Sequence, residues 1–231
     1  MPIFIQRQID QLRRQVLAIG ALCEENVRSS VNAVLTSDTD LAARVIESDK
    51  EIDLLEVDLE EECLHTLALH QPVAHDLRYV VAILKINNDL ERIGDHAKNI
   101  AQQAIVLADA PELERMPYDL RAMAGYTTDM LGESLDALVE LDVAKAKAVR
   151  KLDDAVDTIN AEMYSTSIRL MRQSPHQVDT LVTLMSVSKQ LERIADHAWN
   201  IAKDVVYITE GEILRHARTR HARQQQPPDP E

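Results

Sequence analysis

LERIGDHAKNIA (residues 90–101) and LERIADHAWNIA (residues 191–202) are two copies of one motif, identical at ten of twelve positions. Apolar residues around each copy recur at alternating steps of three and four, a spacing that places one apolar stripe along a helix. Such a stripe suits packing at a shallow angle in a helical bundle. The stripes are Ile83, Ile86, Leu90, Ile93, Ala97, Ile100, Ala104 and Leu107, and Leu184, Val187, Leu191, Ile194, Ala198, Ile201, Val205 and Ile208.

The duplication extends beyond this motif. DKEID (residues 49–53) matches DDAVD (residues 153–157) at an offset of 104 residues. The same offset aligns Ser30 with Ser134, Ala33 with Ala137 and Asp38 with Asp142. We therefore predict an all-α fold of two tandem antiparallel three-helix bundles, six long helices related by an internal repeat. The predicted domains are residues 1–110 and 111–214, followed by a basic, then proline-rich tail over residues 215–231, which we expect to be disordered.

Composition narrows the class of protein. The 231 residues are 45% hydrophobic but only 3% aromatic, which favours helices over sheets. A formal net charge of −14 would repel a phosphate backbone, so we expect no nucleic-acid partner. The stretch RHARTRHAR (residues 215–223) is the local exception, and it is interpreted as a fraying helix end or as a docking patch for an acidic partner. Without a membrane-length apolar run or a secretion signal, we expect a cytoplasmic protein.

Acidic residues repeat on the face opposite the apolar stripe. Glu91 and Asp95 lie one turn apart on this face, and Asn99 continues it. Glu192, Asp196 and Asn200 do the same in the second copy. Two acids at this spacing repel each other, so they do not stabilise a helix. Their presence in both copies favours a function for the carboxylates over an ordinary solvated face.

Carboxylates four residues apart can converge on one hard cation or bridge two. The second helices carry further pairs at this spacing, and hairpin packing can bring them beside the third helices, one cluster per copy. An all-oxygen shell favours Mg²⁺, Ca²⁺, Mn²⁺ or iron. His96 and His197 would also admit zinc, although their place at the edge of the stripe favours packing or support of other ligands. The predicted metal ligands are Asp49, Asp53, Glu91, Asp95, Asp153, Asp157, Glu192 and Asp196.

A doubled helical unit with D-x-x-x-D on its second helix and LERI-x-DHA-x-NIA on its third resembles the PhoU family, over roughly residues 5–212. The resemblance implies a cytoplasmic, non-enzymatic regulator of phosphate uptake and phosphate homeostasis. It also implies negative regulation of the phosphate-starvation response, by communication with the cytoplasmic ATPase side of a phosphate ABC transporter and with a sensor histidine kinase. Some family members bind multinuclear iron or zinc clusters through E/D-x-x-x-D motifs, a role that carries over onto the eight acids above. Magnesium or manganese are the other candidate ions.

Two features depart from the family pattern. DLR (residues 76–78) opens the third helix of the first copy, but the second copy has Asp179 and Thr180 with no arginine. The tail over residues 215–231 also lies outside the family core. We expect contact with the membrane through partners only. The oligomeric state is not determined by the sequence, and a homodimer is the state to test.

Two alternative functions stay open. A metal-free helical adaptor would use the acidic stripes to bind a basic partner surface. A di-iron carboxylate enzyme would need two E-x-x-H motifs facing a bundle core, and the chain has one, from Glu62 to His65, with Glu162 and Ser165 as the local counterpart. Glycine-rich phosphate loops and G-x-S-x-G are absent from the sequence, which removes nucleotide-dependent and serine hydrolase mechanisms.

Overall fold

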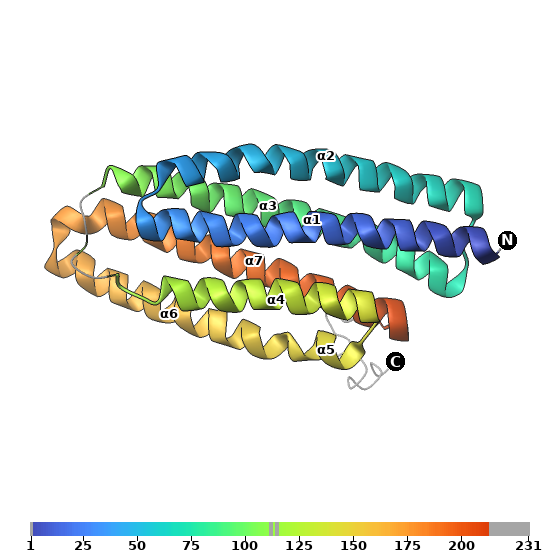
Figure 1. Ribbon diagram of the computed structural model, residues 1–231. Helices are drawn as coiled ribbons and strands as arrows, with labels where there is room; N and C mark the ends of the chain where they lie inside the picture. The colour runs from blue at the N-terminus through green and yellow to red at the C-terminus, as the bar shows by residue number, and fades with distance from the viewer. Residues whose placement is uncertain (1, 111–112, 114–115, 213–231) are drawn as a thin grey trace, which may run out of the picture.

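The computed structural model describes residues 2–110, 113 and 116–212, and every regular element in these ranges is helical. Figure 1 shows two bundles lying side by side with their long axes aligned, which confirms the predicted pair of three-helix bundles. The elements are α1 (Pro2–Thr36), α2 (Thr39–His70) and α3 (Ala74–Ala108), then α4 (Leu120–Glu140), α5 (Val143–Ala148), α6 (Arg150–Gln173), the 3₁₀ turn η1 (Pro175–Gln177) and α7 (Val178–Glu210).

The second helix of the second repeat is divided into α5 and α6, whereas α2 runs without a break. Val149, between the two pieces, keeps helical backbone angles (φ −52°, ψ −33°), so the chain continues in nearly the same direction. The proposed domain boundary falls next to residues 111–112 and 114–115, and the predicted tail begins after residue 214; these segments lie outside the described residues.

The first hairpin turn is built the same way in both repeats. Asp38 N donates to Ala33 O at 3.1 Å, and Asp142 N donates to Ala137 O at 3.0 Å. The side chain of each aspartate then accepts hydrogen bonds from free amides of the following helix, which is ordinary N-capping. The sequence offset of 104 therefore corresponds to a repeated three-dimensional turn.

The residue before each capping aspartate lies in the left-handed region. Ser37 has φ 53° and Leu141 has φ 52°. Glycine is favoured at this position because other L-residues meet steric strain there. The chain tolerates the strain twice because the flanking helices fix the turn.

The apolar stripes form the core of the two bundles. Every stripe residue of α7 is buried, and every stripe residue of α3 is buried except Leu107, which packs at the edge. α3 lies against α7, and α1 lies against α4, so these helices form the boundary between the repeats (Figure 1). Gly20 allows α1 to approach α4 closely, because a Cβ at this position would lie 2.5 Å from Leu135 Cδ1.

Among the described residues, no helix combines the length and the apolar character that crossing a membrane requires.

Candidate functional site

The first repeat brings its four predicted acids together between α2 and α3; we call Asp49, Asp53, Glu91 and Asp95 the first acidic cluster. Asp49 forms the floor, with only 3% of its side chain exposed. Glu91 and Asp95 are half-buried, with 26% and 32% of their side chains exposed, and Asp53 is exposed at the rim. The predicted meeting of the two D/E-x-x-x-D pairs is thus observed, but the floor acid is far more buried than a solvated face implies.

A lysine ammonium lies inside the first acidic cluster. Lys98 Nζ donates to Asp49 Oδ2 at 2.5 Å and to Asp95 Oδ1 at 3.1 Å, so it bridges the acids of α2 and α3. Arg92 lies 3.3 Å from Glu91 Oε2 and 3.6 Å from Asp95 Oδ2. Three of the four carboxylates therefore already have a basic partner from α3.

Gly94 makes room for the buried floor. A Cβ at this position would lie 3.2 Å from Asp49 Oδ1 and 3.1 Å from Ile52 Cδ1. The missing side chain therefore lets α2 approach α3 closely at the cluster. The corresponding positions of the second repeat hold Ala195, one methyl group larger than glycine, and Val156, one methyl group smaller than isoleucine.

The second acidic cluster consists of Asp153, Asp157, Glu192 and Asp196. Asp153 is buried like Asp49, whereas Asp157 and Asp196 are exposed. Arg150 Nε lies 3.7 Å from Asp153 Oδ2, and Lys189 pairs with Glu192. Within the described residues, neither Asp157 nor Asp196 makes an ion pair, and no basic group bridges the acids of α6 and α7.

Two acids of each cluster have a raised pKa: Asp49 and Glu91 in the first, and Asp153 and Asp196 in the second. Burial, followed by repulsion from Asp157, raises the pKa of Asp153. Burial and the neighbouring Glu192 raise the pKa of Asp196 in the same way. Burial also raises the pKa of Asp49, although the hydrogen bond from Lys98 opposes this effect and raises the pKa of that lysine. A bound cation would stabilise the ionised form of these groups.

The donor chemistry of both clusters suits a hard cation, because each cluster offers four carboxylates, one of which is the buried floor acid. In their present positions, no three His, Cys, Asp or Glu side chains of the described ranges are grouped to hold a metal ion. The place between the floor acid and the third-helix acid is taken by the Lys98 ammonium in the first cluster. The second cluster has no such group, so its residues fit a metal better.

The two histidines of the repeated motif lie between the repeats. His96 Nδ1 is 2.7 Å from Gln190 Oε1, and His197 Nδ1 is 2.7 Å from Asp89 Oδ1. Their ring centroids are 5.5 Å apart. Both residues therefore join α3 to α7, and burial lowers the pKa of His96.

Arg78, which has no counterpart in the second repeat, also joins the repeats. Its Nε donates to Ile208 O at 3.2 Å, in the last turn of α7, where carbonyls lack helical partners. Arg78, which only the first repeat has, therefore has a structural role at the boundary between the repeats.

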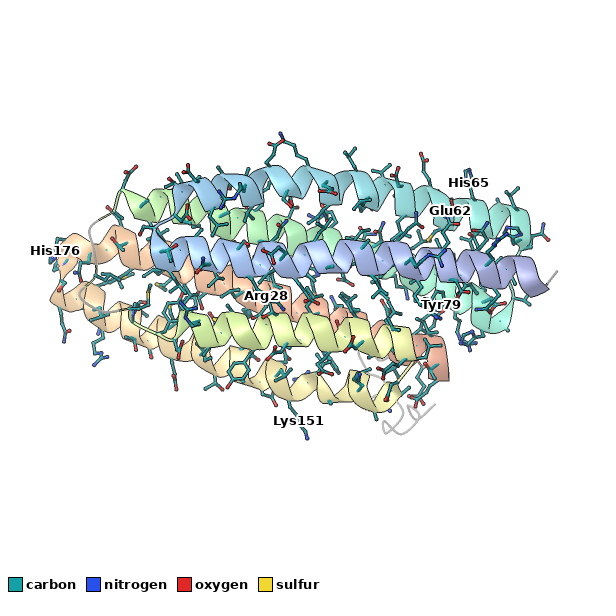
Figure 2. The ribbon with its side chains drawn as sticks, in the orientation of Figure 1. Arg28, Glu62, His65, Tyr79, Lys151 and His176 are labelled. Carbon is teal, nitrogen blue, oxygen red and sulfur yellow. The ribbon has the colours of Figure 1, made fainter. Side chains whose placement is uncertain are left out.

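The single E-x-x-H motif lies on α2, where His65 is exposed and Glu62 is half-buried (Figure 2). It does not face the bundle core as the alternative di-iron centre requires.

Lys98 is the important site residue that the sequence interpretation missed. Its signal was present, because Lys98 and Trp199 are one of the two differences between the repeated motifs. Spacing alone could not show that this side chain turns into the cluster. Asp89 and Gln190 were missed as well, because they lie just outside the repeated motif.

The described residues define a doubled helical bundle with one acidic cluster per repeat. The family model of the PhoU domain matches residues 16–104 and 120–205, one match in each bundle. The chain belongs to the PhoU family, whose members are accessory and regulatory proteins without enzymatic activity, and it is not an enzyme.

Relatives match over most of their length. The phosphate-specific transport system accessory protein PhoU homologue of Pseudomonas aeruginosa is 36% identical over 213 residues, covering 90% of this chain and 86% of the relative. The homologue of Aquifex aeolicus is 36% identical over 211 residues, covering 91% and 95%.

Two solved structures share the fold. The crystal structure of PhoU from Pseudomonas aeruginosa superposes with a TM-score of 0.86 at 35% identity, covering 90% of this chain and 99% of that one. The phosphate transport system regulatory protein PhoU from Streptococcus pneumoniae gives 0.81 at 26% identity, covering 91% and 99%.

Proposed function

We propose that this chain is a cytoplasmic regulator of phosphate uptake and phosphate homeostasis, which restrains the phosphate-starvation response when phosphate is plentiful. It couples the ATPase side of a high-affinity phosphate ABC transporter to a sensor histidine kinase, and it reaches the membrane only through these partners. The observation that carries the proposal is the name of the relatives: accessory proteins of the phosphate-specific transport system, aligned over about nine-tenths of this chain.

The structure supports an adaptor of this kind. Two bundles side by side offer long helical faces, and a net charge of −14 favours basic patches on partners. A homodimer is part of the proposal, and light scattering would then give a molar mass near twice the 26.0 kDa of the chain. A mass equal to one chain at micromolar concentration would contradict it.

Deletion of the gene in its own host tests the regulatory role. We expect starvation-induced genes to stay on in phosphate-rich medium and phosphate uptake to rise, with both reversed by the wild-type chain on a plasmid. Deletion of the kinase gene in the same strain should switch these genes off again. Unchanged expression and uptake after the first deletion would contradict the proposal.

We also propose that the acidic clusters bind a metal, iron or zinc first and magnesium or manganese next. Each repeat carries four acids on two neighbouring helices, one of them a buried aspartate, and this arrangement supports the metal part of the proposal. Elemental analysis of protein purified without chelator and without a polyhistidine tag tests it. Protein free of metal, which also takes up none on titration, would overturn the metal part while leaving the regulatory role intact.

The metal-free adaptor is the second candidate, and the ion pairs of Lys98 and Arg92 in the first cluster favour it. In that case the acids are structural or contact a basic partner. Neutralising them would then weaken partner binding without any change in bound metal.

A further inference from the structure

We propose that Lys98 is a built-in cation that keeps metal out of the first acidic cluster, so that metal binds the chain at the second acidic cluster alone. The inference rests on the metal part of the proposed function. It adds that the two repeats, similar in fold, have different ligands: an internal ammonium in one and an external divalent cation in the other.

Lys98 occupies the position that a bridging metal ion would need. Its Nζ lies within hydrogen-bonding distance of a carboxylate oxygen from each of the two helices, at 2.5 Å and 3.1 Å. A cation bridging the D/E-x-x-x-D pairs of α2 and α3 would have to lie between the same oxygens. The two charges repel, so a metal must first displace the ammonium from a buried aspartate.

The second repeat lacks this obstacle. Trp199 stands where the first repeat has Lys98, and its partly buried ring packs against the core. An indole has a single N–H donor and no charge, so it cannot replace an ammonium between two carboxylates. The acids of α6 and α7 therefore face each other without a bridging cation.

Arg150 is the basic group nearest to the floor of the second cluster. It takes the position of Ile46 in the first repeat, so a positive charge has moved from the third helix to the second. Its Nε lies 3.7 Å from Asp153 and 3.9 Å from Asp154, beyond hydrogen-bonding distance, and 55% of its side chain is exposed. The guanidinium stacks over Trp199 at 5.8 Å. It makes no ion pair with Asp196, so it does not fill the bridging position.

Lys189, Arg193 and Lys203 are further basic side chains near the second cluster, and Lys203 Nζ lies 5.7 Å from the centroid of the Trp199 ring. Lys189 pairs with Glu192 alone. Arg193 corresponds to Arg92, which binds two acids of the first cluster, yet it forms no ion pair among the described residues. Lys98 and Arg92 of α3 thus pair with three acids of the first cluster, whereas Lys189 of α7 pairs with one acid of its own helix and does not bridge to α6.

The test measures how many Mn²⁺ ions bind to untagged protein from which metal has been removed with a chelator. Binding is detected as a decrease in the electron paramagnetic resonance signal of free Mn²⁺. Manganese prefers oxygen ligands, which limits binding to surface histidines. We expect the wild-type chain to bind Mn²⁺ and the double variant Asp153→Asn/Asp196→Asn to bind none. The matched variant of the other repeat, Asp49→Asn/Asp95→Asn, should keep the wild-type stoichiometry. Circular dichroism checks that each variant remains folded.

Two exchanges at the differing position provide the sharper test. Lys98→Met removes the ammonium but keeps most of the stem, and we expect it to double the bound Mn²⁺ by opening the first cluster. Trp199→Lys should weaken binding at the second cluster at least tenfold, whereas Trp199→Phe and Arg150→Met should leave the stoichiometry unchanged. Lys98→Arg keeps the charge and should stay at the wild-type stoichiometry.

The outcomes separate the two proposals. Equal loss of Mn²⁺ from the two double variants, or an unchanged stoichiometry in Lys98→Met, would overturn this inference and leave metal binding in place. No Mn²⁺, Zn²⁺ or Fe²⁺ bound by either the wild-type chain or Lys98→Met would overturn both the inference and the metal part of the proposed function.

Discussion

Ile52 of α2 packs directly against Gly94 of α3, with its Cδ1 only 3.1 Å from the place that a Cβ on residue 94 would occupy. At the equivalent positions of the second repeat, Val156 is smaller than isoleucine and Ala195 is larger than glycine. The repeat thus contains its own compensating substitution, one on each helix.

This pair predicts a favourable coupling between two substitutions. Gly94→Ala gains up to about 1 kcal/mol of helix propensity but crowds Ile52, at a cost of about 1–3 kcal/mol. Ile52→Val alone costs about 1 kcal/mol. In the double variant, valine makes room for the new methyl group. We therefore expect the double variant to be more stable, by at least about 0.5 kcal/mol, than the sum of the two single-variant effects predicts. Denaturant unfolding of the four proteins measures this, and strict additivity would show that the two side chains do not compete for space.

Replacing the third-helix acids by amides should remove bound metal without unfolding the protein. The four changes are Glu91→Gln, Asp95→Asn, Glu192→Gln and Asp196→Asn. Partly exposed pairs contribute only about 0–1 kcal/mol, so the fold of the apo protein should survive the four changes. Bound metal should fall sharply, because an amide is a poor substitute for a bridging carboxylate. Elemental analysis and thermal unfolding measure both effects, with Glu60→Gln/Glu61→Gln as a control that neutralises exposed acids elsewhere on α2. Wild-type metal content in the variant would exclude these residues as ligands.

Glu24 predicts a pH-dependent stability. Burial between α1 and α4 raises its pKa above 4.5. The positive charge of Arg28 lowers the pKa in part, whereas repulsion from Asp136 and Asp129 raises it further. Because the folded-state pKa is raised, the stability from this group is complete below about pH 4.5 and is lost as the pH rises through the folded pKa. Glu24→Gln should therefore be more stable than the wild type at pH 7 by about 0.5 kcal/mol.

The advantage of Glu24→Gln should shrink as the pH falls towards 4, where the carboxyl of the wild type is protonated. Unfolding in chelator-containing buffer at several pH values provides the measurement. Exposed Glu61→Gln serves as the control and should show no such trend. An advantage that is constant with pH would mean that packing, and not ionisation, causes the difference.

Ser37 offers a simple stabilising substitution. Its left-handed backbone (φ 53°) is strained for serine but not for glycine, and its side chain is exposed. Ser37→Gly should therefore raise the free energy of unfolding by about 0.5–1 kcal/mol. The denaturant midpoint should rise at constant slope. Ser37→Ala retains the strain, and a gain in that variant equal to the gain with glycine would rule out backbone relief as the cause.

The fold was predictable because its signals are periodic. The alternating steps of the stripe from Ile83 to Leu107 can be satisfied only on a helix, and the repeat at residues 184–208 doubles the evidence. The break in the pattern after residue 35 allows either Ser37 or Asp38 as the N-cap, and the structure has Asp38. The division at Val149 was not, because its backbone hardly departs from a helix.

The site was only partly predictable. Spacing placed the acids of each repeat on facing sides of two helices, and they do converge. The bridging ammonium of Lys98 depends on how a long side chain turns within an assembled hairpin, which no spacing rule describes. The position of His96 and His197 between the repeats depends on which helices meet across the boundary, and an apolar stripe on each helix does not specify that choice.

The contact between α3 and α7 is reciprocal: His96 meets Gln190, and His197 meets Asp89, which occupy equivalent positions at the offset of 101. This is the self-complementary contact of a two-fold symmetric dimer, made within one polypeptide. Half-length chains would have to find each other in solution and would separate on dilution. Covalent linkage replaces that encounter with a fixed effective concentration. The paired bundles therefore stay assembled at any copy number, including a few molecules per cell.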